Sequence, residues 1–184
     1  MDLREITEFF RDFMWYIIVI IVIVFIFTFV VSIQTVAGNS MFPTLEDGNM
    51  VLVSKISYRL ANIKRNDIVV LKNNGKTFVK RVIGLPGEKI EYMDGYLYID
   101  GESFKETFLN SDVVTYNFMF IDVCSLEDCP DGKIPNNMYL VMGDNRPESS
   151  DSRDKSFGLV DKSDIKGKVF FKLWPFGKVN WLLM

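Results

Sequence analysis

Histidine is absent from this sequence of 184 residues. Its absence excludes Ser-His-Asp and Cys-His catalytic arrangements and the two-histidine zinc sites of metalloproteases, so any hydrolytic chemistry here needs another base. Cysteine is scarce too, because Cys124 and Cys129 are the only two, too few for a four-cysteine zinc site. In an extracytoplasmic segment these two could close a small disulfide loop, and two free thiols are the equal alternative.

Positive charge is also in short supply. Lysine and arginine total 21 against 24 aspartate and glutamate residues, which gives a net charge of -3. The broad basic surface of a nucleic-acid-binding protein is therefore missing, and we expect no nucleic acid among its partners.

Long hydrophobic runs are limited to one, over residues 13–33, which contain no charged side chain. As a helix rising about 1.5 Å per residue, this run is long enough to cross a hydrocarbon core of roughly 30 Å. A cleaved signal peptide is the competing interpretation, but its apolar region usually covers only about 7 to 15 residues and a good cleavage motif does not follow. The sequence therefore predicts a transmembrane helix.

Basic residues flank this helix unevenly. Arg4 and Arg11 precede it, whereas the first basic residue after it is Lys55. Lysine and arginine concentrate on the cytoplasmic side of membrane helices, whereas acidic residues have little influence on orientation. We therefore expect a single-pass protein of the cell membrane, with residues 1–12 in the cytoplasm and the part after the helix extracytoplasmic.

Beyond the helix, short apolar segments alternate with turn signals, and helical periodicity is not sustained. Asn74-Gly75 and Asp94-Gly95 each separate two alternating segments, which is the signature of a β-hairpin. The predicted fold class is therefore mostly β, an antiparallel β-sheet domain after one N-terminal transmembrane helix. We expect strands over residues 50–55, 67–72, 76–84, 89–93, 96–99, 138–142 and 168–173.

Residues 91–135 differ from the rest of this domain, since they contain Asp-Gly turns, both cysteines and a polar stretch over 125–133. Such features are typical of a surface insertion. We therefore divide the extracytoplasmic part into a β core, residues 34–90 and 136–184, and a small inserted cap, residues 91–135.

A candidate nucleophile, Ser40, lies shortly after the membrane helix. Gly38 precedes it and Pro43 follows it, which predicts a tight loop that can expose a hydroxyl group and aim backbone N–H groups. Most Gly-X-Ser sequences are plain turns, so Ser40 has catalytic meaning only if a base lies beside it.

Lys80 is the candidate base. In the strand Phe78 to Ile83, period two places it on one face with Phe78 and Val82, an apolar setting that lowers the pKa of a lysine. Neutrality at pH 7 requires a fall of about three pKa units, which costs about 4 kcal/mol. Neighbouring Arg81 does not deprotonate in proteins. Alternatively, Lys80 extends its ammonium group to solvent or pairs with a carboxylate.

A third segment, residues 143–153, combines carboxylates, guanidinium groups and hydroxyls between two apolar strands. This density of opposite charge indicates a fixed polar network, in which a serine could hold a neutral lysine while Asp151 and Arg153 brace that serine. The alternative is a polar surface turn.

Together these segments resemble one family, the bacterial type I signal peptidases, which use a serine/lysine dyad, and in particular its Gram-positive-like short form. Four conserved boxes of that family have counterparts here, in the same order after a single anchor. They are residues 38–44 for the nucleophile, 66–70 for a following strand, 80–88 for the lysine and 143–153 for the last box. Any one of them alone is weak, but the four in order are specific.

The resemblance implies a role for each matching residue. Ser40 would be the nucleophile of a signal peptide-removing serine endopeptidase and Lys80 its general base. The hydroxyl of Ser149 would orient Lys80, and Asp151 and Arg153 would support the site. No metal and no cofactor is required by this chemistry.

The resemblance also implies how substrate binds. Family members bind it in extended form beside both catalytic residues, which places Val36 and Val79 in the small pockets that accept Ala-X-Ala. The expected partners are secretory preproteins and membrane lipid. Gly38 stands where some members carry a hydroxyl residue that helps to stabilise the oxyanion, so the second donor to that oxyanion stays open.

Two other functions would use parts of the same pattern. A self-cleaving serine/lysine regulator would normally carry a DNA-binding domain, and this chain has a membrane span instead. A membrane-anchored β-domain without enzymatic activity would explain the helix and the strands but would leave the four boxes as coincidence.

Overall fold

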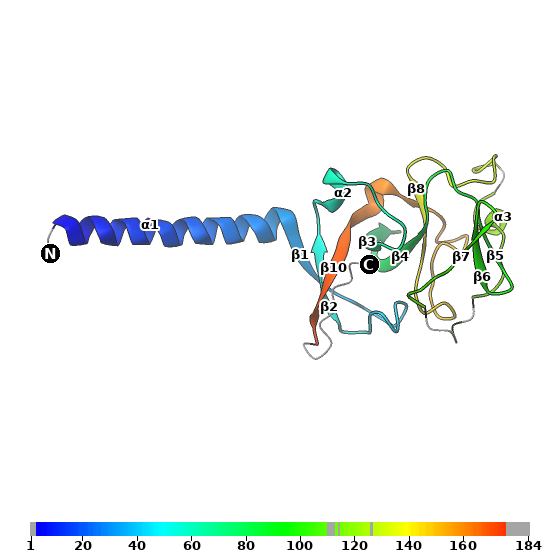
Figure 1. Ribbon diagram of the computed structural model, residues 1–184, viewed down its shortest axis with the longest axis horizontal. Helices are drawn as coiled ribbons and strands as arrows, with labels where there is room; N and C mark the ends of the chain where they lie inside the picture. Colours follow the sequence, from blue (N-terminus) through cyan, green and yellow to red (C-terminus); the bar gives the residue numbers. More distant parts are fainter. Residues whose placement is uncertain (1–2, 110–112, 114, 126, 176–184) are drawn as a thin grey trace.

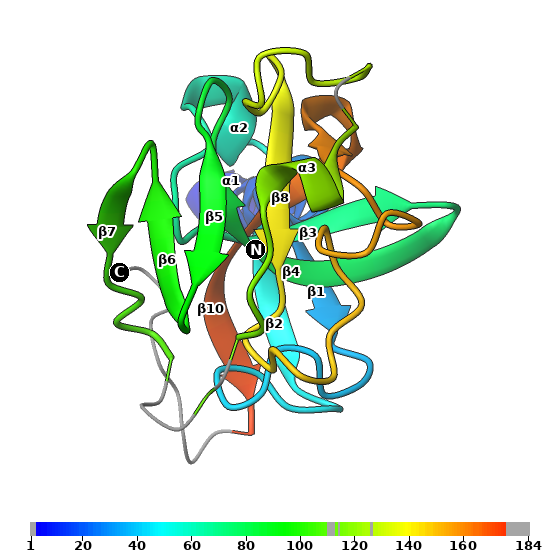
Figure 2. The same ribbon diagram turned by 90° about the vertical axis from the view of Figure 1, so that its right-hand side faces the viewer.

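The computed structural model describes residues 3–109, 113, 115–125 and 127–175. The end of the predicted β core, residues 176–184, lies outside the described residues. A long N-terminal helix projects from a domain that contains two β-sheets (Figures 1 and 2).

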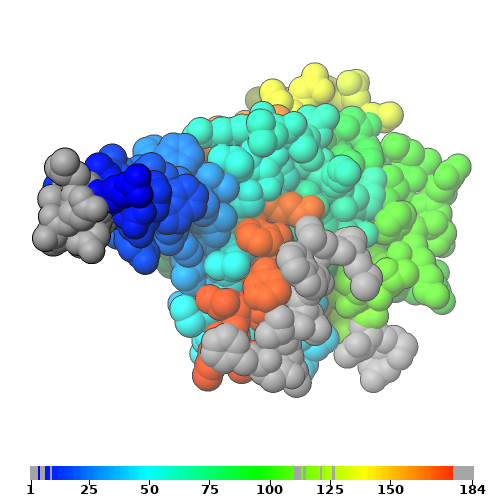
Figure 3. Space-filling view, turned by 60° about the vertical axis from the view of Figure 1, so that its left-hand side comes forward, coloured from blue at the N-terminus to red at the C-terminus, as the bar shows by residue number. Residues whose placement is uncertain are grey.

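The N-terminal helix α1 runs over Leu3–Phe25 and continues as a short π-helical segment, η1, over Ile26–Val30. Its apolar stretch Phe10–Val30 has a mean hydropathy of 3.0, and none of it is buried inside the protein. In the space-filling view of Figure 3 the helix, in dark blue, extends past the β-domain on the left. An apolar helix without protein around it is what a membrane anchor requires.

The helical segment ends three residues before the predicted boundary at residue 33, because strand β1 begins at Val31. Residues Val31–Thr35 pair antiparallel with β2, so their backbone groups are satisfied by a sheet ladder instead of a helix. The uncharged run of residues 13–33 therefore forms the end of a helix and the start of a strand, and hydropathy alone does not show where one changes to the other.

The larger sheet has seven antiparallel strands in the order β1-β2-β10-β3-β4-β8-β9. Both predicted hairpins are confirmed, since Asn74 and Asp94 have the positive φ values that a tight Asn-Gly or Asp-Gly turn needs. The strands of this sheet are β1 Val31–Thr35, β2 Met50–Ser54, β3 Ile68–Asn73, β4 Lys76–Gly84, β8 Met138–Met142, β9 Val160–Asp161 and β10 Ile165–Trp174.

A second sheet of three antiparallel strands begins one residue before the segment predicted to be the cap and otherwise lies within it: β5 Ile90–Met93, β6 Tyr96–Ile99 and β7 Glu102–Phe104. Cys124 and Cys129 form a disulfide bond beside the short helix α3, Phe120–Val123, which decides between the two alternatives that the sequence left open. Two further short helices complete the described elements, α2 Ser57–Leu60 and the 3₁₀ turn η2 Lys162–Asp164.

Three hydrophobic clusters hold these elements together. Along β3, Val69 and Leu71 enter one cluster while Ile68 and Val70 enter another, as expected for the two faces of a buried strand. The third cluster joins the sheets, because Leu140 of β8 packs with side chains of the cap. The cap is therefore packed onto the larger sheet through a continuous apolar core.

Candidate active site

Ser40 lies in the loop between β1 and β2. Gly38 has a φ of +80° and donates its N–H to Asp47 Oδ1 over 2.7 Å, which closes the base of the loop. Met41 and Leu45, on the far side of Ser40, are completely buried. The loop is thus fixed at both ends, with the partly buried Ser40 between them.

Lys80 lies on β4 and is 1% exposed. Its Nζ donates a hydrogen bond of 2.8 Å to Ser149 Oγ. Burial lowers the pKa of Lys80 from its ordinary value of 10.5 to about 8, and the positive charge of Arg153 adds to this, while Asp151 and Asp144 oppose it. The predicted direction of the pKa is confirmed by its environment.

Asp151 connects Ser149 to Arg153. Its carboxylate accepts hydrogen bonds of 2.8 and 2.9 Å from Arg153 and one of 2.9 Å from the Gly143 N–H. Burial by itself would raise the pKa of Asp151, but the hydrogen bonds and charge of Arg153, with Ser149 and Gly143, lower it. The ionised Asp151 is thus able to accept a hydrogen bond from the Ser149 hydroxyl, and the Ser149 oxygen accepts one from Lys80.

Gly143 is where the nucleophile loop meets this network. A Cβ atom at this position would lie 2.3 Å from both Ser149 Oγ and the Ser40 carbonyl oxygen, so only glycine lets them approach. Asn145 holds the same loop, donating its backbone N–H to Ser40 O over 3.0 Å and its side chain to Asn39 O over 3.1 Å. Ser40 is therefore brought beside the Ser149–Lys80 pair.

The structure thus brings together all five predicted residues of the reaction centre. Within the part of the chain that the structure describes, the Ser40 hydroxyl makes no hydrogen bond to Lys80. Such catalytic hydrogen bonds are often long in substrate-free enzymes and shorten when substrate binds.

A buried ion pair beside the site was missed by the sequence. Arg81 donates to both carboxylate oxygens of Asp144, over 2.8 and 2.6 Å, and Thr44 donates to the same carboxylate over 2.5 Å. Asp144 is completely buried, and Arg81 lies 4.1 Å above the ring of Phe108. This pair clamps β4 to the start of segment 143–153. The density of charge in segment 143–153 indicated that it forms ion pairs, but it did not indicate that Arg81 is the partner of Asp144.

Val36 and Val79, the predicted substrate-binding residues, contact one hydrophobic cluster. Val36 is 3% exposed, and Val79 is partly buried. Residues 76–80 of β4 pair with β3 on one side, while β8 pairs with β4 only from Arg81 onward. Among the described strands, none pairs with the other edge of residues 76–80, so an extended peptide can add there.

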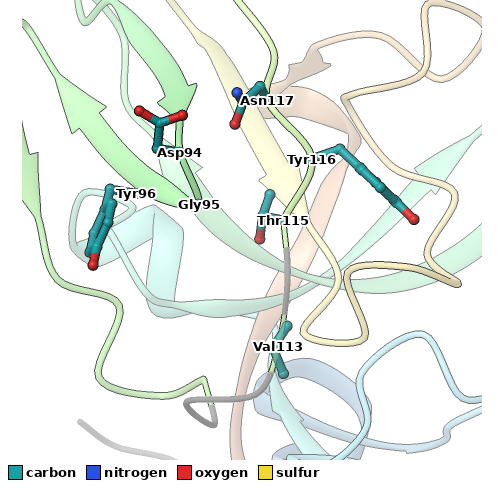
Figure 4. A pocket seen from close by; sticks show the side chains of 7 residues that line it. All are labelled: Asp94, Gly95, Tyr96, Val113, Thr115, Tyr116 and Asn117. Atoms are coloured by element: carbon teal, nitrogen blue, oxygen red, sulfur yellow. The ribbon is translucent and has the colours of Figure 1, made fainter.

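Other possible sites lie apart from this centre. A pocket of about 760 Å³ in the cap is lined by residues of the β5–β6 turn and of segment 113–117, and Figure 4 shows Thr115 on that segment. Among the described residues, no group of three His, Cys, Asp or Glu side chains is placed to hold a metal ion.

Known proteins similar to this chain share one activity in their names. Residues 8–174 match the family described as "Signal peptidase, peptidase S26". The chain is 40% identical over 161 residues to signal peptidase IB of Staphylococcus aureus strain MRSA252, with 83% of each chain covered. It is 42% identical over 156 residues to signal peptidase I of Bacillus caldolyticus, with 80% of this chain and 82% of the relative covered.

A solved structure is also similar, the crystal structure of a signal peptidase I from Enterococcus faecalis V583. Its sequence identity to this chain is 36%, and the TM-score is 0.49. The match covers 59% of this chain and 97% of that one.

Proposed function

The chain belongs to the signal peptidase family, peptidase S26, and we propose that Ser40 is its nucleophile and Lys80 its general base. It is a membrane-anchored serine endopeptidase that removes signal peptides from secretory preproteins. The hydrogen bond of 2.8 Å from the buried Lys80 to Ser149 is the observation that carries the proposed roles. Membership of this family does not favour a binding domain without enzymatic activity.

In the proposed reaction, neutral Lys80 accepts the proton of Ser40 while the hydroxyl oxygen attacks the substrate carbonyl carbon. The tetrahedral intermediate collapses as the C–N bond breaks, and Lys80 returns the proton to the leaving amine. A water molecule, deprotonated by the same lysine, then attacks the acyl-enzyme carbonyl. The bond from that carbon to Ser40 Oγ breaks, and the lysine returns the proton to Ser40. With a pKa of about 8, roughly a tenth of Lys80 is neutral at pH 7.

Ser149, Asp151 and Arg153 keep Lys80 in the geometry that this reaction needs. Because the Ser149 proton is directed to Asp151, Ser149 accepts one N–H of Lys80 and fixes the direction of the amine. The lysine lone pair is then available to the Ser40 proton. The guanidinium of Arg153 keeps Asp151 ionised through two hydrogen bonds. An ionised carboxylate can only accept hydrogen bonds, so Ser149 remains the donor to Asp151 and the acceptor from Lys80.

The oxyanion of the intermediate accepts a hydrogen bond from the backbone N–H of Ser40. Gly38 offers no hydroxyl, and its own N–H is engaged by Asp47. Gly38 therefore does not supply the second hydrogen-bond donor to the oxyanion.

The substrate binds as an added strand along the open edge of residues 76–80, and its small side chains before the cleaved bond enter pockets bordered by Val36 and Val79. This arrangement selects Ala-X-Ala sites, because Val36 is buried in the cluster against which the partly buried Val79 packs, and this packing leaves little room for larger groups.

In the proposed topology, residues 1–12 are cytoplasmic, the apolar helix spans the membrane, and the β core with its cap lies on the extracytoplasmic side. Membrane lipid surrounds the exposed apolar side chains of α1. The preprotein is still held in the same bilayer by its signal segment, so the anchor brings the site to the cleavage point.

Lys80→Met tests the proposed base. We expect cleavage of a preprotein to fall below detection while the fold is retained, because methionine fills the apolar space but accepts no proton. Circular dichroism and a cleavage assay measure the two properties on the same sample. Lys72→Met, at an exposed lysine of the neighbouring strand β3 and outside the proposed substrate edge, is the matched control and keeps its activity. Near wild-type activity in Lys80→Met would refute the dyad.

A further inference from the structure

The inserted cap contributes no residue to the reaction centre described above, yet one side chain of segment 143–153 reaches into it. Arg146 is 1% exposed, although arginine is rarely buried without partners. Its guanidinium donates to Tyr92 Oη over 2.6 Å, to Thr115 Oγ1 over 2.9 Å and to Glu106 Oε1 over 2.5 Å. All three partners belong to the cap.

Glu106 neutralises this buried charge. Besides the bond of 2.5 Å it accepts a second hydrogen bond from Arg146, of 3.2 Å, and one from the Tyr92 hydroxyl. Burial is the main cause that raises the pKa of Tyr92, and the charge of Glu106 raises it further. Tyr92 therefore stays neutral and donates a hydrogen bond to Glu106. A bidentate pair of this kind fixes direction as well as charge.

The other end of Arg146 is held to the reaction centre. Its Nε donates to Gly143 O over 3.0 Å, and its backbone oxygen accepts from Arg153 over 2.7 Å. Gly143 in turn contacts Ser149 and donates to Asp151. The guanidinium in the cap is therefore linked through one hydrogen bond to the Gly143 backbone, which lies against the Ser149 hydroxyl.

We propose that Glu106 and Tyr92 of the cap are positioning residues for peptide cleavage, which act through Arg146 and Gly143 to hold Ser149 against Lys80. The cap is then part of the catalytic apparatus and not a passive insertion. The proposal rests on the function proposed above for Lys80.

Weakening the contacts from Glu106 and Tyr92 to Arg146 changes the solvent exposure of Lys80. The groups that face Lys80 are Ser149 and the charges of Asp151, Arg153 and Asp144. If Gly143 and Ser149 move away, water reaches the ammonium group and the pKa of Lys80 rises toward its ordinary value, because burial is the main cause of its lowering. The acidic side of the pH profile of kcat/KM, which reports the free enzyme, then shifts to higher pH.

The test is that pH profile, measured on the full-length chain in detergent for Tyr92→Phe and Glu106→Gln. Both substitutions keep the shape of the side chain and weaken the hold on Arg146. We expect the acidic side to move up by about one pH unit, so that activity at pH 7 falls about tenfold and is largely restored at higher pH. KM should change by less than about twofold.

Two controls separate positioning from stability. Glu102→Gln removes an exposed carboxylate of the cap and should keep the wild-type profile. Val123→Ala weakens the hydrophobic cluster of the cap without removing a hydrogen-bond partner of Arg146, so it should lower the melting temperature and leave the profile of the folded enzyme in place.

Either of two results would overturn the proposal: a wild-type profile in folded Tyr92→Phe, or the same shift in Val123→Ala. Tyr92→Phe alone carries the test if Glu106→Gln does not fold. The wild-type profile separately tests the proposed base, since an enzyme that does not gain activity as pH rises through about 8 does not use Lys80 in this way.

Discussion

At the scale of single residues, the reactive groups could be predicted while their partners could not. The period of the strand and its apolar neighbours are local, so they were enough to indicate that Lys80 is buried and easily deprotonated. The Arg81–Asp144 pair joins residues 63 positions apart. Nothing in the pattern of either segment specifies which opposite charge it meets, because that depends on how the strands are arranged.

The burial of Lys80 has a consequence for stability that activity assays do not measure. The pKa of Lys80 is about 8 in the folded protein and 10.5 ordinarily, so the unfolded chain binds more protons between these values. Wild-type stability should therefore rise as pH increases through this window. The full penalty, present below pH 8, is about 3 kcal/mol at 1.36 kcal/mol per pKa unit.

Lys80→Met removes this penalty. We expect its free energy of unfolding to exceed that of the wild type at pH 7, by up to about 3 kcal/mol, with the difference shrinking toward pH 10.5. Urea unfolding at pH 7 and pH 10 measures the difference, and Lys76→Met, an exposed lysine, should show none. A gap that is the same at both pH values would contradict a buried, titrating lysine.

At the scale of elements, strands that form hairpins were predictable and short elements were not. Met138–Met142 has the predicted bounds, and Asn74-Gly75 and Asp94-Gly95 mark their turns through residues that tolerate positive φ. Strand β9 has two residues and helix α2 four, too few for a period to appear. Strand β1 was hidden because it continues an apolar run.

The orientation of α1 is a prediction at this scale. Single cysteines, introduced at the exposed positions Glu8 and Asn136 after both native cysteines are replaced by serine, report on the two sides of the membrane. A membrane-impermeant maleimide should label Asn136→Cys in intact cells and Glu8→Cys only after permeabilisation. The reverse pattern would invert the topology inferred from the basic residues.

At the scale of the whole molecule, the site exists only where three distant segments meet. Ser40, Lys80 and Ser149 come from a loop, a strand and a second loop, and Gly143 allows the two loops to touch. Local patterns suggested each segment, and the resemblance to a family supplied their grouping. The dependence of the site on the cap, through Arg146, followed neither from composition nor from spacing, because it is a contact between tertiary layers.

The most direct test of the account is to incubate the detergent-solubilised chain with a preprotein that carries an Ala-X-Ala site, beside Ser40→Ala, and to map the products by mass spectrometry. We predict one cut, directly after the last alanine, by the wild type and none by Ser40→Ala. No cut by a folded wild-type sample, or the same cut by Ser40→Ala, would contradict the central claim that Ser40 attacks the signal peptide bond.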